Sequence, residues 1–411
     1  MATRNIVGNV PEPEELYGRS DLIDHLWRQI RGNNILLLAP RRFGKTGVMN
    51  HVLSRPQEGH LPVYLELEDI DSPDEFVWRL VKELMSRSRL RAFLATVRGL
   101  PRGVTDWFKE TFDEAGFEGA KVKFKESMAE SWRDAARKLV VELEKAEPAL
   151  VFIFDELPAM LEEISNKHGD DEARSFLAWF RSVRLQRKDK LRRHRFIVGG
   201  STGIDLILRR LNSPDKLNDF ERLYVEPIAE PEARSLAADL AKSMDVELTE
   251  KLIHRLLELI GPHVPYFIHL FFSQLGQLPA AKRHPLSRET LDHVYQTRVL
   301  GPACKHYFDH YRSRLARYGK RLERRAVVVL DAVASQGRVS ASAMYDVYQK
   351  PSKVGASELG FSELMADLEC DWYLVLDTRT NEYHFMLNVM RDWWRRWYGS
   401  PRRKAPSAAE K

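Results

Sequence analysis

The stretch ILLLAPRRFGKTGVM, residues 35–49, decides the fold. Its four aliphatic residues predict a buried strand, and the residues from Thr46 onward predict a helix. The connection between them has the features of a phosphate-binding loop: Gly44 where no side chain fits, Lys45 to meet the β- and γ-phosphates, and the Thr46 hydroxyl for Mg²⁺. Ala39 stands where glycine is usual in that motif. The alternative interpretation is a basic turn that caps a helix.

A pair of acidic residues ends a second apolar run, LVFIFDELP at 150–158. In P-loop enzymes the first acid of such a pair holds Mg²⁺ through water, and the second orients or deprotonates the attacking water. These roles fall to Asp155 and Glu156. Alternatively, Asp155 caps the helix that follows the strand.

Two further positions are candidates for contact with a γ-phosphate. The next strand ends in VGGSTG at 198–203, where Ser201 or Thr202 would bind the phosphate or the attacking water, unless the segment is only a Gly-Ser turn. Arg222 stands directly before the predicted fifth strand and could act as an arginine finger toward a neighbouring subunit. An ordinary surface arginine remains the alternative.

Composition limits the class of protein. The chain has 411 residues, 44% of them hydrophobic, which predicts two or three globular domains. The two cysteines, Cys304 and Cys370, cannot form a disulfide framework, so we expect a cytoplasmic protein. No segment has the composition of a signal peptide or a membrane span, so we expect no membrane partner. The thirteen histidines form no metal-binding array, which leaves Mg²⁺ as the expected metal.

The order of apolar segments predicts three parts and a tail. Continuous apolar strands alternating with helices indicate a parallel αβα core over 1–226, interrupted by an irregular insertion at 89–128. Three amphipathic segments predict a helical lid over 227–300. Three helices, a hairpin and a closing helix predict a winged helix-turn-helix domain over 301–400, followed by a disordered tail at 401–411.

Several motifs together resemble the archaeal-type ATPases of the AAA+/STAND group. They are YGR at 17–19, LLAPRRFGKT at 37–46, FIFDELPAML at 152–161, FLAWFRSVR at 176–184, VGGSTGI at 198–204, GPHVPYFIHL at 261–270 and YHFMLNVMRDWWRRW at 383–397. The resemblance implies ATP and Mg²⁺ as cofactors, Glu156 as catalytic base, and Ser201 or Thr202 as sensor. Thr46 and Asp155 would hold the metal. The implied nucleotide-binding residues are Ala39, Pro40, Arg41, Arg42, Phe43, Gly44, Lys45, Thr46 and Gly47, with Tyr17 and Arg19 on the adenine side and Pro265 in the lid. The segment 261–266 has no arginine, where many AAA+ proteins place a second sensor, and this favours a slow switch over a fast motor.

The sequence leaves two kinds of macromolecular partner open. The expected recognition helix, SELGFSELMADLECD at 357–371, carries five acids and no basic residue, and a DNA groove would repel it. This favours an ATPase switch that self-associates and recruits a protein partner. Basic clusters at 181–195 and 312–325 and near the C-terminus favour the alternative, a DNA-binding ATPase similar to origin-recognition or transposition regulators. The aromatic run Trp393, Trp394, Trp397 and Tyr398 predicts core packing rather than base stacking.

Overall fold

The computed structural model describes residues 3–88, 90, 132–144, 147–185, 194–200, 203–279, 285–352 and 356–399. The chain divides into two compact units: Glu12–Val225, and Met1–Pro11 together with Glu226–Lys411. The predicted core range 1–226 therefore differs from this unit at its first eleven residues and at Glu226. The further boundary between a lid and a winged domain at residue 300 stays a prediction. Residues 91–128 and 401–411, predicted as an insertion and a tail, lie outside the described residues.

The first unit contains the predicted parallel sheet. Its strand order is β2-β3-β4-β1-β5, and all its neighbouring strands run parallel. Because β4 lies between β1 and β3, the carboxyl ends of these three strands meet at one edge of the sheet, where parallel α/β folds bind ligands. The strands are β1 Asn34–Leu38, β2 His60–Glu66, β3 Ala149–Asp155, β4 Arg195–Gly200 and β5 Phe220–Tyr224.

Two strand boundaries differ from the sequence prediction. Strand β2 begins at His60, so Pro62 lies inside it; an edge strand such as β2 tolerates a proline because one side of its ladder is unpaired. Strand β5 begins at Phe220, and Arg222 pairs with Leu36 in the middle of the ladder. The prediction that Arg222 precedes the fifth strand was wrong.

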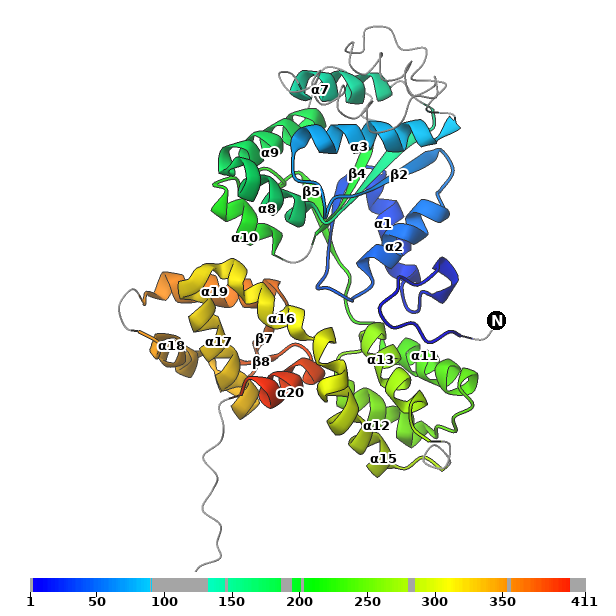
Figure 1. Ribbon diagram of the computed structural model, residues 1–411, viewed down its shortest axis with the longest axis vertical. Helices are drawn as coiled ribbons and strands as arrows, with labels where there is room; N and C mark the ends of the chain where they lie inside the picture. The colour runs from blue at the N-terminus through cyan, green and yellow to red at the C-terminus, as the bar shows by residue number, and fades with distance from the viewer. Residues whose placement is uncertain are drawn as a thin grey trace, which may run out of the picture. The chain divides into compact units, whose positions relative to one another are not determined.

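Helices cover both faces of this sheet (Figure 1). Alternate strand residues, among them Leu36, Phe154 and Val198, belong to one large buried cluster with the helices of one face, whereas the helices of the other face contribute nothing to that cluster. The alternation follows from the two-residue period of a strand. The first face carries α3 Pro73–Ser86, α7 Trp132–Leu143, α8 Leu157–His168, α9 Asp170–Leu185 and α10 Ile204–Arg210, and the second carries α1 Ser20–Ile30 and α2 Lys45–Ser54. This is the parallel αβα core of a P-loop NTPase.

From Glu226 onward, the second unit contains first the helices predicted as a lid. Each has an apolar stripe that is buried, and Thr249 caps α12 by accepting a hydrogen bond from the Leu252 amide. The helices are α11 Glu230–Ser243, α12 Glu250–Ile260, α13 Pro265–Gly276 and α15 Arg288–Val294. Short helical turns then lead through α16, Asp309–Ser313, to the C-terminal region.

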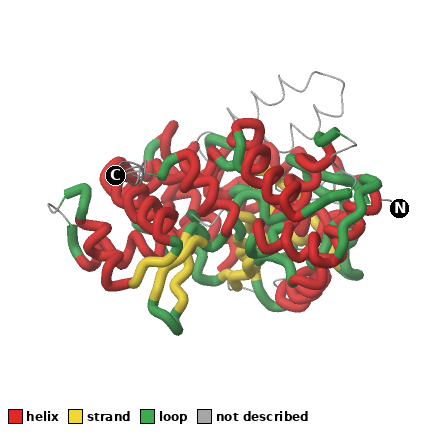
Figure 2. Tube along the Cα trace, turned by 90° about the horizontal axis from the view of Figure 1, so that it is seen from below, coloured by secondary structure: helices red, strands yellow, loops and turns green. Residues whose placement is uncertain are grey.

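The C-terminal region has the element order of a winged helix-turn-helix domain. Its small antiparallel sheet has the order β6-β8-β7, and Figure 2 shows these strands in yellow with their connecting turn in green. Strand β6 has only three residues, too few for a sequence pattern to reveal it. The elements are α17 Gly319–Gln336, β6 Arg338–Ser340, α18 Ala341–Gln349, α19 Glu358–Cys370, β7 Leu374–Asp377, β8 Glu382–Phe385 and α20 Asn388–Trp397.

Trp393 and Trp394 of the aromatic run lie in the core of this unit, as predicted, whereas Trp397 and Tyr398 are only partly buried. Trp393 and Trp394 are fully buried, and Trp394 Nε1 donates to Asp331 Oδ1 at 2.7 Å. Trp397 Nε1 donates to the Leu300 carbonyl at 3.0 Å. In the part of the chain that is described, no helix combines the length and apolar character needed to cross a membrane.

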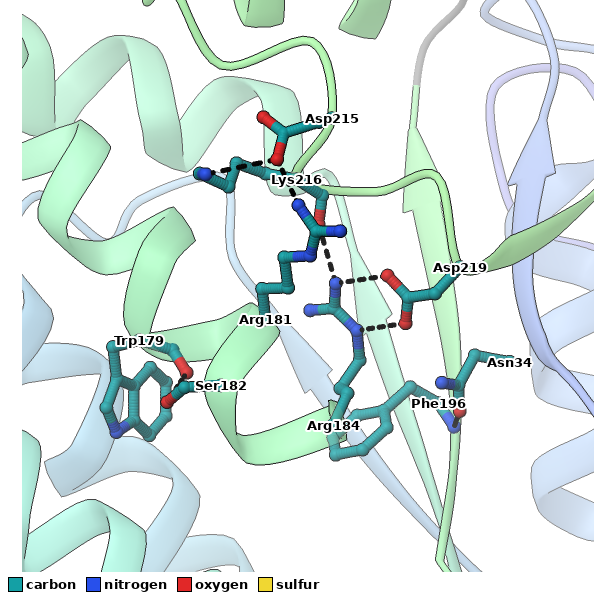
Figure 3. A network of polar contacts seen from close by, with 9 residues as sticks. All are labelled: Asn34, Trp179, Arg181, Ser182, Arg184, Phe196, Asp215, Lys216 and Asp219. Atoms are coloured by element: carbon teal, nitrogen blue, oxygen red, sulfur yellow. Dashed lines mark hydrogen bonds and ion pairs between the residues drawn. The ribbon is translucent and has the colours of Figure 1, made fainter. Parts of the chain in front are cut away.

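A buried arginine network holds the amino edge of the parallel sheet (Figure 3). Arg184 Nε and Nη2 donate to the two carboxylate oxygens of Asp219 at 2.9 and 2.8 Å, and Nη2 also donates to the Lys216 carbonyl at 2.7 Å. The guanidinium lies over the rings of Phe180 and Phe220, 4.2 and 4.5 Å from their centroids. The first part of the basic cluster 181–195 therefore stabilises the fold, at the edge opposite the phosphate loop.

Candidate nucleotide-binding site

The loop between β1 and α2 has the backbone of a phosphate-binding loop. Gly44 has φ of +94° and Arg42 has φ of +74°, so two left-handed residues turn the chain immediately before α2. A Cβ at Gly44 would meet no atom within 4 Å, so this position requires glycine for its backbone angle and not for space. Arg42 adopts the same region without that freedom, a strain that is typical of ligand-binding loops. At the start of the loop, the Ala39 amide donates to the Gly200 carbonyl of β4.

Lys45 lies between the two acidic residues at the end of β3. Its Nζ is 2.6 Å from Glu156 Oε1 and 3.0 Å from Asp155 Oδ1. Lys45 and Asp155 are both buried. Burial alone would lower the pKa of Lys45, but the charges and hydrogen bonds of Glu156 and Asp155 outweigh it and raise the pKa. The ammonium group is therefore charged at neutral pH, ready to bind an anion.

Thr46 and Asp155 form a pair of oxygen ligands beside this lysine. Thr46 Oγ1 donates to Asp155 Oδ2 at 2.9 Å. A hydroxyl and a carboxylate are the ligands that P-loop enzymes present to Mg²⁺, which takes its remaining ligands from water and phosphate. The donor set therefore fits Mg²⁺. Asp155 Oδ1 also accepts the Glu156 amide at 2.9 Å. The N-cap of α8 is Glu156, and no side chain caps this helix, so the alternative that Asp155 caps it was wrong.

Glu156 has a special position at the start of α8. Its φ is +60°, a left-handed backbone conformation that residues other than glycine, asparagine and aspartate rarely adopt. This angle aims its carboxylate at Lys45, on the side where the phosphate loop lies. Strain of this kind is maintained where the surrounding structure requires it, commonly at active sites.

Two residues of β2 complete the acidic end of the sheet, and the sequence analysis missed both. Burial, followed by the charge of the nearby Asp155 carboxylate, raises the pKa of Tyr64, so the phenol stays protonated. Glu66 pairs with Asp155 in the β2–β3 register. Burial and then the neighbouring Asp155 raise the pKa of Glu66. The only sequence signal was the position of both residues at the end of a predicted strand.

Gly199 makes room for Asp155 next to β4. A Cβ at this position would lie 2.4 Å from Asp155 Oδ1 and 2.5 Å from Met49 Cε, closer than van der Waals contact permits. At Gly200 the nearest atom would be Pro158 Cγ, at 3.3 Å. The double glycine in the sequence was a signal for this close approach, but the sequence analysis used it only as a turn.

Arg19 of the motif at 17–19 contacts the loop between β1 and α2. Arg19 is buried, and its Nη2 donates to the Phe43 carbonyl at 3.0 Å. Phe43 is buried as well, whereas Arg41 points outward and its Nη2 contacts Glu68 Oε1 at 2.8 Å. The contact places Arg19 directly against the loop. Tyr17, in the turn that precedes α1, stays a predicted adenine contact.

The described structure does not test the remaining predicted residues at this cluster. Ser201 and Thr202 lie outside the described residues. Arg222 donates from Nη1 and Nη2 to the two carboxylate oxygens of Asp205 in α10, both at 2.7 Å. Pro265 is the first residue of α13 and belongs to the second unit. Their roles at a nucleotide stay predictions.

Solved structures of similar fold cover nearly the whole chain. A Walker-type ATPase of Pyrococcus abyssi aligns with a TM-score of 0.62 and 16% identity over 95% of this chain and 99% of its own. The ORC2 protein of Aeropyrum pernix, solved in ADPNP–ADP complexes, aligns with a TM-score of 0.51 and 11% identity over 95% and 96% of the two chains. These similarities show a shared fold, that of archaeal P-loop ATPases. No protein-family model and no curated protein matches the sequence.

Proposed function

We propose that this protein binds ATP with Mg²⁺ at the loop 39–47 and hydrolyses it slowly, as a molecular switch. The observation that carries the proposal is the meeting of Lys45, Thr46, Asp155 and Glu156 at one edge of the sheet. A buried lysine with two carboxylates and a hydroxyl is the arrangement that a nucleotide triphosphate and its metal need. The shared fold with a Walker-type ATPase and with a protein solved with adenine nucleotides supports it.

Each residue then has a definite task. Lys45 leaves its carboxylate partners and binds the β- and γ-phosphates, and this release frees Glu156 to accept a proton from the attacking water. Thr46 and Asp155 would hold Mg²⁺, which neutralises the phosphate charge when bound.

The other predicted residues surround the rest of the nucleotide. Arg19 fixes the loop through the Phe43 carbonyl and, with Tyr17, borders the adenine side. Ser201 or Thr202 would sense the γ-phosphate, Pro265 would contact the nucleotide from the lid, and Arg222 would act in an assembled neighbour.

The switch would act through self-association and a protein partner. Helix α19 supports this interpretation, because its exposed residues include Glu358 and Glu363 and none that is basic. Acidic side chains repel the phosphates of DNA, whereas they attract basic protein surfaces. The alternative, a DNA-binding ATPase, rests on Lys320, Arg321 and Arg324, which are exposed on α17.

Calorimetric titration with ATP and Mg²⁺ tests the nucleotide proposal. Lys45→Ala should remove binding, whereas Glu156→Gln should keep binding but lose most of the phosphate release. Lys167→Ala is a matched control, because Lys167 pairs with Asp71 on the surface of the same unit. Equal ATP affinity in the wild type and in Lys45→Ala would refute the proposal.

Titration with duplex DNA at increasing salt separates the two kinds of partner. A DNA-binding ATPase should bind at low salt and lose affinity steeply as salt rises, because counterions are released on binding. Absence of binding at low salt, with and without ATP, favours the protein-recruiting switch. The measurement needs only the purified full chain.

A further inference from the structure

A basic hollow lies in the second unit, at the surface of α17. Its volume is about 540 Å³, within the range of about 300–1,000 Å³ that is usual for ligand pockets. Three of its lining residues are cationic, three are apolar and one is acidic: Arg312, Lys320, Arg324, Val327, Val328, Pro351 and Glu323. A site of this composition suits an anionic occupant that also has an apolar group.

The positive charge of this hollow is not compensated within the described part of the chain. Arg312 Nη1 donates to Glu323 Oε1 at 2.7 Å, so the single carboxylate is already paired. Lys320 and Arg324 are both exposed. Among the described residues, Lys320 and Arg324 therefore have no ion-pair partner.

Helix α19 has an exposed surface that is apolar and negatively charged, whereas the hollow is positively charged. Leu359 is 71% exposed, more than any other large hydrophobic residue among those described. Glu358, Ser362 and Glu363 are exposed around it, and positions 359, 362 and 363 share one helix face because they are three and four residues apart. An exposed leucine with acidic neighbours matches the chemistry of the hollow in both its apolar and its charged parts.

We propose that α19 of one copy of this protein docks into the hollow of a second copy. Leu359 would contact Val327, Val328 and Pro351, while Glu358 and Glu363 would face Lys320 and Arg324. Because the two surfaces are different patches of the same unit, the contact is head-to-tail and extends to further copies unless a ring closes. It provides a surface for the self-association proposed above and rests on that part of the proposal, but it requires no nucleotide.

A second copy accounts for the observations better than nucleic acid does. Phosphate groups would use Lys320 and Arg324 but would leave the three apolar lining residues without a partner. The acidic α19 would gain nothing from nucleic acid. A contact of one helix face with one hollow is small, so we expect weak association that salt reduces further.

Two variants, one on each side of the contact, test the proposal. Leu359→Asp removes the apolar side chain from α19, and Lys320→Glu with Arg324→Glu reverses the charge of the hollow. Arg321→Glu is the matched control, since Arg321 is exposed on the same helix but does not line the hollow. Sedimentation of the nucleotide-free full chain, at low and at high salt, gives the mass distribution of each protein and of a mixture of the two variants.

The mixture gives the decisive result. Each variant alone should be monomeric, and the Arg321→Glu control should associate as the wild type does. The mixture should form dimers but nothing larger, because only one intact α19 and one intact hollow can meet. A monomeric wild type, or variants that associate as the wild type does, would overturn the proposal. Loss of duplex DNA binding in the charge-reversed variant, with unchanged association, would assign the hollow to nucleic acid instead.

The same samples distinguish this contact from the nucleotide proposal. If the wild type and both variants are all monomeric without ATP and all associate when ATP is present, assembly runs through another surface; this would overturn the α19 contact and leave ATP binding intact. Conversely, dimers in the mixture together with unchanged ATP affinity in Lys45→Ala would support the contact and refute the nucleotide site.

Discussion

Lys45 Nζ lies 3.0 Å from Asp155 Oδ1, and both side chains are buried although they come from different strand–loop–helix units. Two carboxylates surround this ammonium group, and removal of one partner from a buried ion pair leaves uncompensated charge. Lys45→Met should therefore lower the free energy of unfolding of the nucleotide-free protein by about 3 kcal/mol, measured by urea denaturation. An unchanged midpoint would show that the carboxylates are solvated and that the pair is not a buried one.

The pH dependence of that stability follows from the raised pKa of Lys45. A cation whose pKa is higher in the folded state stabilises the fold fully below its unfolded pKa and loses this effect as pH rises through the folded value. The wild type should therefore lose stability above about pH 10.5, the usual range of lysine. Lys45→Met should lose less over the same interval in thermal melts at pH 9 to 11.

Gly199 and Gly200 offer a matched pair of substitutions. Gly199→Ala brings a Cβ to 2.4 Å from Asp155 Oδ1, so the carboxylate must leave its present position, in which Oδ2 accepts the Thr46 hydroxyl. We expect the Mg²⁺ dependence of ATP turnover to shift to higher metal concentration in this variant. Gly200→Ala, with its nearest contact at 3.3 Å to a proline ring, should remain close to the wild type. Equal metal dependence of the two variants would contradict the crowding at Asp155.

Substitutions in the arginine network at the amino edge of the sheet should change the free energy of unfolding but not the affinity for ATP. Arg184→Met leaves Asp219 without its buried partner and should cost about 3–5 kcal/mol of unfolding free energy. Arg181→Ala removes a surface ion pair with Asp215 and should leave the free energy of unfolding close to that of the wild type. ATP affinity of the folded Arg184→Met protein, measured at low temperature, should match the wild type. A loss of affinity would mean that the two edges of the sheet are coupled.

The lowered pKa of Asp219 predicts how the stability of the fold changes at acid pH. Burial works to raise its pKa, but the hydrogen bonds and charge of Arg184 outweigh that effect and lower it. A carboxylate with a lowered pKa stabilises the fold above its unfolded pKa and loses the effect as pH falls through the folded value. Stability of the wild type should therefore decline below about pH 4, and Asp219→Asn should show a shallower decline.

Arg222 can be tested as a residue that acts on a neighbouring subunit. If it does, Arg222→Ala should reduce ATP turnover of the assembled protein by a factor of about 10³ or more, while dilute, unassembled protein shows no change. Asp205→Asn frees the guanidinium from its bidentate partner and should leave turnover equal or higher. A concentration-independent effect of Arg222→Ala would assign the residue to the Asp205 ion pair alone.

The sequence predicted the elements whose patterns are local. The strand, loop and helix at 35–49, the strand that ends at Asp155 and the order of the C-terminal elements all correspond to motifs or periodic segments of the chain, and the structure confirms these elements. The contacts of Tyr64, Gly199 and Asp205 depend on which strands and helices become neighbours, and no local pattern carries that information. Strand β6 was missed because it owes its existence to pairing with β8. Arg222 was misplaced because β5 begins where Leu217 and Asp219 fix the chain, upstream of the apolar run.

If ATP binds at this loop as proposed, the ion pairs of Lys45 make its entry an exchange reaction. ATP would have to draw the ammonium group away from two carboxylates, and those carboxylates would then repel the incoming phosphates unless a divalent cation compensates them. Free Mg²⁺ and ATP should accordingly bind with strong positive cooperativity, and chelation of the metal should eject the nucleotide. A protein with this property would respond to the cell's supply of MgATP as one ligand, and not to total adenine nucleotide.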